Sequence, residues 1–214
     1  LNHQSVVEVD TGEHARKEMS VFFSDIRSFT TMVEGKSPED SYRFINEYLL
    51  QMEPGIRNNH GFVAEVVGDA VMALFDDGGA DNAVRAAIEC QRSLLAYNEH
   101  RMRRGEQEVL SGIGICSGEL MLGTIGSSDR IKCGVIGDAV NTAARVENLT
   151  KRYGTGILIT HHTRDELTDP LAYLMRPIDR IRVKGKNDPM TIYEILDALP
   201  ERMMDFRMRA RSDF

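Results

Sequence analysis

Short apolar runs alternate in this chain with longer segments of helical periodicity, and this alternation restricts the folds that it can form. The first run, residues 19–24, is expected to be a buried strand. Ser37 and Pro38 are typical of a helix start, and apolar residues follow them at helical spacing. We expect Pro54 and Gly55 to kink or end that helix.

The rest of the chain continues the same alternation of strands and helices. Gly68 and Asp69 separate two apolar runs in the pattern of a β-hairpin, and Ser117 and Gly118 resemble the turn of a second strand pair. Strands are expected at 62–67, 70–75, 109–116, 119–125, 131–136, 156–160, 173–183 and 190–195, and helices at 80–104, 138–151 and from His162. This order predicts an α/β (α+β) fold in which helices cover one mixed sheet.

We expect one domain over residues 18–198, because no repeat of 20–50 residues interrupts the pattern. Residues 1–17 are interpreted as a linker from an upstream regulatory module, since neither an initiator Met nor a signal peptide is present. Residues 199–214 are interpreted as a tail that is weakly helical or disordered.

Composition excludes several classes of protein. With 26 basic and 33 acidic residues the net charge is −7, which argues against a nucleic-acid-binding protein. No stretch approaches the ~20 apolar residues of a membrane span, so we expect no membrane contact by this chain. Three widely spaced cysteines form neither a disulfide framework nor a metal motif; they are interpreted as small buried side chains in a reducing, cytoplasmic compartment.

Two acidic residues stand out because each ends or interrupts an apolar run. Asp25 follows residues 19–24, and Asp69 lies between two strands of the expected hairpin. Asp69 is also an ordinary turn residue, and for this position alone the turn explains it. Two carboxylates at neighbouring strand ends are also suited to a divalent cation.

Three further features carry polar groups suited to a nucleotide. The loop after Asp25 enters a helix, where backbone N–H groups favour phosphate; it comprises Ile26, Arg27, Ser28, Phe29 and Thr30. Asn141 and Arg145 are four residues apart and share one helix face, where they could bind ribose and phosphate. Lys184 precedes a glycine turn and could reach a triphosphate. Taken singly, the loop is a weak signal, the Asn141 and Arg145 pair is about equally explained as an exposed polar pair, and a lone Lys-Gly-Lys is usually a solvated turn.

Taken together and in this order, the motifs resemble the class III nucleotidyl cyclases over residues 18–196. The resemblance rests on FSDIRSFT at 23–30, VGDAVMALF at 67–75, IGICSG at 113–118, VIGDAVNTAAR at 135–145 and VKGK at 183–186. It implies a ferredoxin-like catalytic domain that works as a head-to-tail homodimer. It also implies attack of a ribose 3′-hydroxyl on the α-phosphate of a nucleoside triphosphate, with release of pyrophosphate.

The resemblance assigns roles by position. Asp25, Asp69 and the Ile26 carbonyl would hold two divalent cations, Mg²⁺ or Mn²⁺, on one protomer. The partner protomer would supply Asn141 to orient the ribose, Arg145 to stabilise the transition state and Lys184 to hold the terminal phosphates.

Two positions bear on the choice of base. Glu65 stands where adenylyl cyclases carry Lys, and its carboxylate can accept from the ring N–H and the exocyclic amine of guanine. Gly134 stands at the second base-reading position and has no side chain to donate to the guanine carbonyl. The combination resembles bacterial guanylyl cyclases of the cyanobacterial type and predicts GTP as the substrate.

Alternatives and one more departure remain open. An adenylyl or mixed-specificity cyclase is the first alternative, because Glu65 can also accept from the adenine amine. A non-catalytic nucleotide-binding regulatory domain is the second, although such a domain is expected to have lost a site residue. Gly112 stands where many family members carry Arg, which leaves Lys184 and Arg27 as candidates for the missing positive charge.

Overall fold

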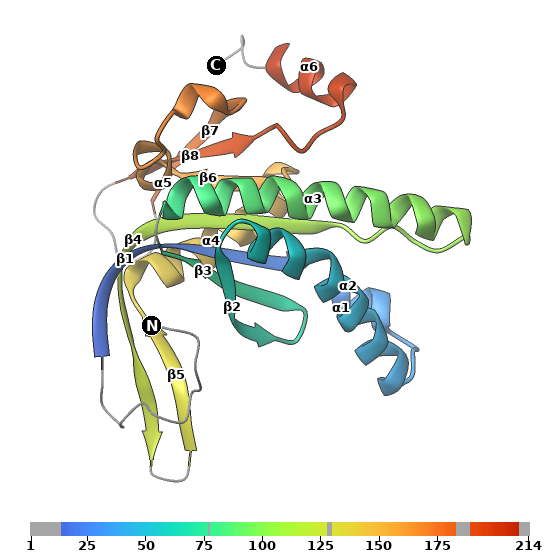
Figure 1. Ribbon diagram of the computed structural model, residues 1–214. Coiled ribbons are helices and arrows are strands. Elements are labelled where there is room, and N and C mark those ends of the chain that lie inside the picture. The colour runs from blue at the N-terminus through green and yellow to red at the C-terminus, as the bar shows by residue number, and fades with distance from the viewer. Residues whose placement is uncertain (1–13, 77, 128–129, 183–188, 210–214) are drawn as a thin grey trace.

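The computed structural model describes residues 14–76, 78–127, 130–182 and 189–209, and its centre is an eight-stranded mixed sheet (Figure 1). The strand order is β2-β3-β1-β4-β6-β8-β7, and β5 pairs with β4 outside this path. The strands are β1 (His14–Ile26), β2 (Gly61–Val67), β3 (Ala70–Phe75), β4 (Ser111–Ser127), β5 (Arg130–Ile136), β6 (Ile157–Thr160), β7 (Met175–Ile181) and β8 (Met190–Ile195). Among the described strands, β4 and β6 are the one parallel pair and the other pairs are antiparallel, so the predicted mixed sheet is confirmed.

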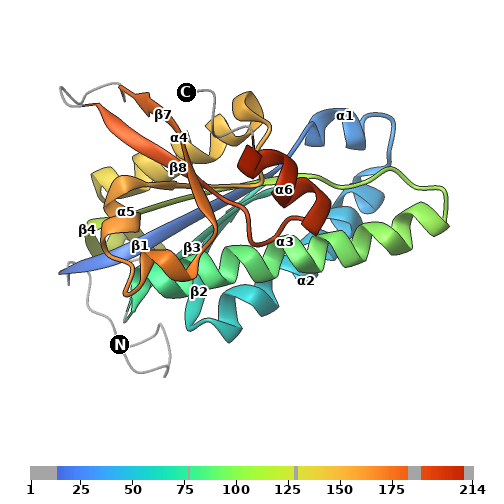
Figure 2. The same ribbon diagram turned by 90° about the horizontal axis from the view of Figure 1, so that it is seen from above.

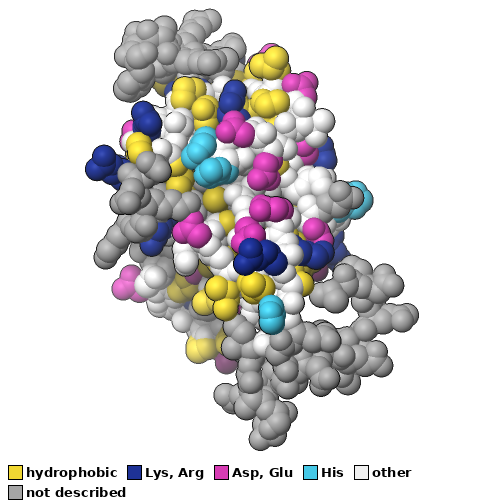
Figure 3. All heavy atoms as spheres, turned by 90° about the vertical axis from the view of Figure 1, so that its left-hand side faces the viewer, with side chains coloured by type: hydrophobic (Ala, Val, Ile, Leu, Met, Phe, Trp, Pro, Cys, Tyr) yellow, Lys and Arg dark blue, Asp and Glu magenta, His cyan; other side chains and the backbone are white. Residues whose placement is uncertain are grey.

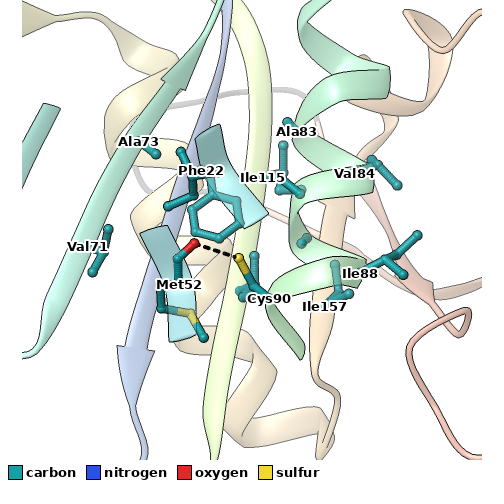
Figure 4. Packing of buried hydrophobic residues seen from close by; sticks show 14 of the residues in the cluster. Phe22, Met52, Val71, Ala73, Ala83, Val84, Ile88, Cys90, Ile115 and Ile157 are labelled. Atoms are coloured by element: carbon teal, nitrogen blue, oxygen red, sulfur yellow. Dashed lines mark hydrogen bonds between the residues drawn. The ribbon is translucent and has the colours of Figure 1, made fainter. Parts of the chain in front are cut away.

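Helices cover both faces of this sheet. Helices α2 and α3 lie on one face and α4 lies on the other (Figures 1 and 2). The helices are α1 (Phe29–Val33), α2 (Pro38–Asn58), α3 (Gly79–Arg103), α4 (Asp138–Tyr153), α5 (His161–Asp165) and α6 (Glu201–Arg209), with a 3₁₀ turn at Pro170–Ala172. Alternating residues serve the two layers: Phe22 packs under α2 and α3 (Figure 4), while Val21 packs toward α4.

The turn that we expected at Ser117 and Gly118 does not exist. Strand β4 runs without interruption, and β1 pairs with it from His14 opposite Gly123 to Ile26 opposite Ser111. Both polar groups of Ser117 are buried and hydrogen-bonded. Its hydroxyl lies 2.6 Å from the Ser20 hydroxyl, and its backbone N–H donates to Thr163 Oγ1 at 2.9 Å. Partners supplied by distant segments thus make a turn-like residue acceptable inside a strand.

The prediction that Pro54 and Gly55 end the second helix is wrong, because α2 continues to Asn58. A proline at position 54 leaves the carbonyl of Leu50 without its helical donor, and Leu50 is 66% exposed, so water can replace that donor. Gly55 permits close contact with α3: a Cβ there would lie 2.8 Å from Cys90 Sγ. The same thiol donates to the Met52 carbonyl at 3.3 Å (Figure 4).

Both ends of the described chain are more ordered than the sequence indicated. Residues 14–17, interpreted as linker, belong to β1 and pair with β4. In the predicted tail, Arg207 of α6 pairs with the buried Glu194 and donates to the Gly154 carbonyl at 2.6 Å. Cys90 and Cys116 are buried, free thiols as predicted, whereas the side chain of Cys133 lies outside the described residues. A search of the described helices finds none with the length and apolarity to span a membrane.

Candidate functional site

The fold brings the two predicted metal ligands into contact. Asp25 lies near the end of β1, and Asp69 lies in the turn between β2 and β3. Strand β3 runs antiparallel to β1, with Ser24 opposite Val71, which places the hairpin turn beside the end of β1. The Ile26 N–H donates to Asp69 Oδ2 at 3.1 Å, and the Asp25 carboxyl group lies close enough to Asp69 to raise its pKa.

Burial and the nearby Asp25 together raise the pKa of Asp69. Its pKa is raised to about 7, mainly by burial and further by the hydrogen bond and negative charge of Asp25. The backbone N–H groups of Asp69 and Ile26 act in the opposite direction. Two carboxylates that repel each other at one strand end are the arrangement that a bound cation stabilises.

The donor set fits magnesium or manganese in the presence of a nucleotide. Magnesium in such sites takes one or two carboxylates and completes its shell with water and substrate phosphates. Asp25, Asp69 and the Ile26 carbonyl supply oxygen ligands of that kind. No group of three or more His, Cys, Asp or Glu side chains able to hold a metal occurs in the part of the chain that the structure describes. A metal held by Asp25 and Asp69 would take its further ligands from the Ile26 carbonyl, water and substrate phosphates.

Glu147 of α4 is a third carboxyl group near the aspartates that the sequence analysis missed. It is buried at 8% exposure, and its pKa is raised to about 8. Burial is the main cause; the charge of Asp25 and, to a smaller degree, that of Asp69 add to it, while Arg27 lowers it. Its position two residues after Arg145, on the other side of the helix, was the available signal.

Gly112 lies beneath Glu147, opposite Asp25 in the sheet. A Cβ at Gly112 would lie 2.0 Å from Thr150 Oγ1 and 2.8 Å from Glu147 Oε1. No side chain fits there while α4 holds this position. The space that an arginine side chain at Gly112 would need is therefore occupied by Glu147 and Thr150.

The predicted phosphate loop divides into residues that face the core and residues that face outward. Ser28 has a left-handed backbone, with φ 57°, and is exposed, as is Thr30. Phe29 stacks on Phe44 with ring centroids 6.2 Å apart. Among these residues, Ser28 and Thr30 are exposed, where a phosphate could approach.

Arg27 is occupied by the protein. Its guanidinium donates to the Thr150 carbonyl at 3.3 Å and to the Thr155 carbonyl, at the end of α4 and before β6. The predicted phosphate contact would require this side chain to leave both carbonyls. Within the chain, Arg27 fixes the end of α4 against the strand that carries Asp25.

Asn141 and Arg145 lie on the outward face of α4, as their spacing predicts, and both are exposed. Ala143, Glu147 and Thr150 are buried on the inward face. Residues 145 and 147 are separated by about 200° around the helix axis, because an α-helix turns 3.6 residues per revolution. Since Glu147 faces Asp25, Arg145 of the same chain faces away from the aspartate pair.

The remaining predicted residues lie in separate parts of the molecule. Glu65 is exposed on β2, opposite Met72, and Gly134 is half-buried on β5, opposite Gly123. Lys184 lies outside the described residues, so the structure does not place it.

Two hollows mark the surface. The larger, about 580 Å³, is lined by residues that include Glu18, Glu119 and Glu166 and by none of the predicted site residues. Figure 3 views the left-hand side of the molecule in Figure 1, and several acidic side chains lie there among Lys, Arg and His side chains. The second hollow, about 540 Å³, is lined by Arg145 and other residues of α4 and β7. Both hollows border α4, but of the two only the second is lined by a predicted site residue, Arg145.

Comparison with known proteins identifies the family. The adenylate and guanylate cyclase catalytic domain matches residues 12–197. The chain is 41% identical over 197 residues to an adenylate cyclase of Anabaena cylindrica, covering 90% of this chain and 39% of that protein. It is 36% identical to the terminal-differentiation-specific adenylate cyclase of Dictyostelium discoideum, covering 92% of this chain and 10% of that protein. The chain belongs to the family of class III nucleotidyl cyclase catalytic domains.

Solved structures agree with this assignment. The guanylyl cyclase Cya2 superposes with a TM-score of 0.73 at 32% identity, covering 87% of this chain and 95% of that chain. The adenylyl cyclase CyaB from P. aeruginosa gives 0.70 at 30% identity, covering 88% and 98%. The predicted cyclase fold is confirmed, and relatives of both base preferences share it. The chain spans 39% and 10% of the two curated relatives, so it corresponds to a part of those proteins.

Proposed function

We propose that this chain is a guanylyl cyclase catalytic domain that converts GTP to cyclic GMP and pyrophosphate. The observation that carries the proposal is the contact between Asp25 and Asp69 beside the loop at 26–30, within a chain of this family. A site of this kind can hold divalent cations against a triphosphate. A regulatory domain without activity is expected to lack one of the aspartates, Asn141 or Arg145, and all four are present.

The two faces of α4 support a site shared by two copies of the chain. Arg145 points away from the aspartates of its own chain, because Glu147 occupies the side of α4 that faces them. A second copy, arranged head to tail, brings its Arg145 and Asn141 toward the first copy's aspartates. A symmetric homodimer of this kind contains two equivalent sites.

Each residue then has a definite task. Asp25, Asp69 and the Ile26 carbonyl hold two Mg²⁺ or Mn²⁺ ions, which when bound favour loss of the ribose 3′-proton and neutralise the departing pyrophosphate. Backbone N–H groups at 28–30 orient the triphosphate, because those of Ile26 and Arg27 donate within the chain. Asn141 orients the ribose, Lys184 binds the terminal phosphates, and Arg145 stabilises the charge that grows on the α-phosphate during attack.

Glu65 favours GTP over ATP. Its carboxylate accepts from two parallel donors of guanine, whereas adenine presents a lone pair at the same ring position. Gly134 contributes no side chain, so a backbone group or water must meet the guanine carbonyl. ATP is the second candidate substrate, because curated relatives at 41% and 36% identity are named adenylate cyclases. The cytoplasmic location and the upstream regulatory module remain predictions.

The test is product formation by the purified chain with Mg²⁺ or Mn²⁺, with GTP and ATP assayed in parallel. We expect cyclic GMP well above cyclic AMP, and an Asp25→Asn variant serves as the blank for contaminating enzymes. Exchange of the base-reading residues in Glu65→Lys/Gly134→Asp should lower GTP turnover and raise ATP turnover. Dominant cyclic AMP from the unaltered chain would overturn the base assignment, and no product from a folded dimer would overturn the catalytic proposal.

A further inference from the structure

The hollow beside Arg145 is lined by an unusual set of charges. It measures about 540 Å³ and lies between α4 and β7. Its lining residues are Arg145, Asn148, Leu149, Arg152, Asp179, Arg180, Ile181 and Arg182. Four guanidinium groups and one carboxylate give it a formal charge of +3, whereas the whole chain carries −7. We call this hollow the arginine groove.

Backbone geometry explains why the arginines converge. Arg145 and Arg152 are two helical turns apart, so they lie on the same face of α4. Arg180 lies in β7 and Arg182 directly follows its last residue, and both line the groove. The helix and the end of the strand thus each bring a pair of cations to the same space.

The groove holds little negative charge to offset these cations. Its one acid, Asp179, accepts from the Tyr153 hydroxyl and from the Arg180 N–H, the latter at 2.6 Å. Within the described residues, no carboxylate forms an ion pair with Arg152, Arg180 or Arg182, and all three are exposed. Clustered cations repel one another, and a bound anion of several charges removes that repulsion.

We propose that the arginine groove binds a pyrophosphate-type anion through Arg152, Arg180 and Arg182. Guanidinium groups match phosphate oxygens with paired hydrogen bonds, which favours Arg over other side chains at such a site. The inference rests on the proposed function, because cyclisation produces pyrophosphate near Arg145. The anion is either the terminal phosphates of the bound nucleotide or the released product.

Direct binding tests this inference without reference to activity. Inorganic pyrophosphate is titrated calorimetrically into the full chain in EDTA, at fixed salt. We expect Arg180→Gln/Arg182→Gln to bind at least about tenfold more weakly, because two charge-assisted hydrogen bonds are lost. The matched control is Arg57→Gln/Arg103→Gln, which removes two arginines that are both 71% exposed and on other helices. The control should bind within about twofold of the unaltered chain.

Equal loss of affinity in both double variants would show non-specific attraction and overturn the proposal, as would absence of pyrophosphate binding by the unaltered chain. Kinetics then identifies the source of the anion. A raised KM for the nucleotide in the groove variant indicates the substrate's terminal phosphates; an unchanged KM with weaker inhibition by pyrophosphate indicates the product. An inactive chain that binds pyrophosphate through these arginines would contradict the proposed function, but it would still support pyrophosphate binding by the arginine groove.

Discussion

The inward and outward faces of α4 differ in the space that they leave for side-chain substitutions. The inward face packs directly on β4: a Cβ at Gly114 would lie 2.1 Å from the Glu147 backbone nitrogen. The outward face carries Asn141 and Arg145, both exposed, and borders the arginine groove. One helix therefore fixes the fold with one side and presents reactive groups with the other.

This difference separates stability from activity along a single element. Substitutions on the inward face should act on the free energy of unfolding, because close-packed atoms have no room to move. Substitutions on the outward face should act on turnover, because the side chains there contact solvent in the single chain.

The largest expected effect is a loss of turnover from a substitution on the outward face of α4. Arg145→Ala should lower kcat by about 10²–10³, the loss typical of removing one group that stabilises transition-state charge. The thermal midpoint should not change, because the side chain is exposed. The matched control on the same helix is Lys151→Ala, which should retain activity. A large fall in the thermal midpoint of Arg145→Ala would contradict the claim that the outward face of α4 acts on turnover rather than on stability.

The next largest effect is on the inward face. Gly114→Ala should lower the free energy of unfolding by about 1–3 kcal/mol or more, because the methyl group meets α4 backbone that must shift. Chemical denaturation measures this loss. Gly156→Ala is the control, since its Cβ would lie no closer than 3.6 Å to Gln91. Equal stability of the two variants would show that α4 does not need this close approach.

The smallest expected effect on the free energy of unfolding comes from a buried hydroxyl on the inward face of α4. The Thr142 hydroxyl is buried without a hydrogen-bond partner within the described chain. Thr142→Val keeps the shape and removes the polar group, so stability should stay within about 1 kcal/mol or rise. Thr163→Val, by contrast, removes the acceptor of the buried Ser117 N–H and should cost about 1–3 kcal/mol. Denaturation curves that rank the two variants in the reverse order would contradict this explanation.

Local sequence patterns predicted most of the fold. The hairpin at Gly68, the capped start of α2 and the face shared by Asn141 and Arg145 all depend on residues close in sequence. The errors arose where distant segments decide the structure. Ser117 remains in a strand because Ser20 and Thr163 satisfy it, and Pro54 remains in a helix because the carbonyl that it orphans belongs to an exposed residue.

The candidate site shows the same division. The motif around Asp25 and Asp69 predicted that the two acids belong together, and the antiparallel pairing of β1 and β3 brings them into contact. Glu147 escaped notice because its importance comes from the approach of α4 to Gly112, which no local pattern encodes. Similarly, Arg27 resembled a phosphate ligand, and only the fold shows it bound to two carbonyls.

The most direct test of the shared site is complementation between two inactive variants. Asp25→Ala lacks the metal half and Arg145→Ala lacks the transition-state half. Mixed in equal amounts, they should form heterodimers with one intact site, which restores about a quarter of full activity if subunits exchange at random. A mixture of Asp25→Ala with Asp69→Ala should stay inactive, because both changes damage the same half. Demonstrated heterodimers of Asp25→Ala and Arg145→Ala without activity would contradict a site built from two chains.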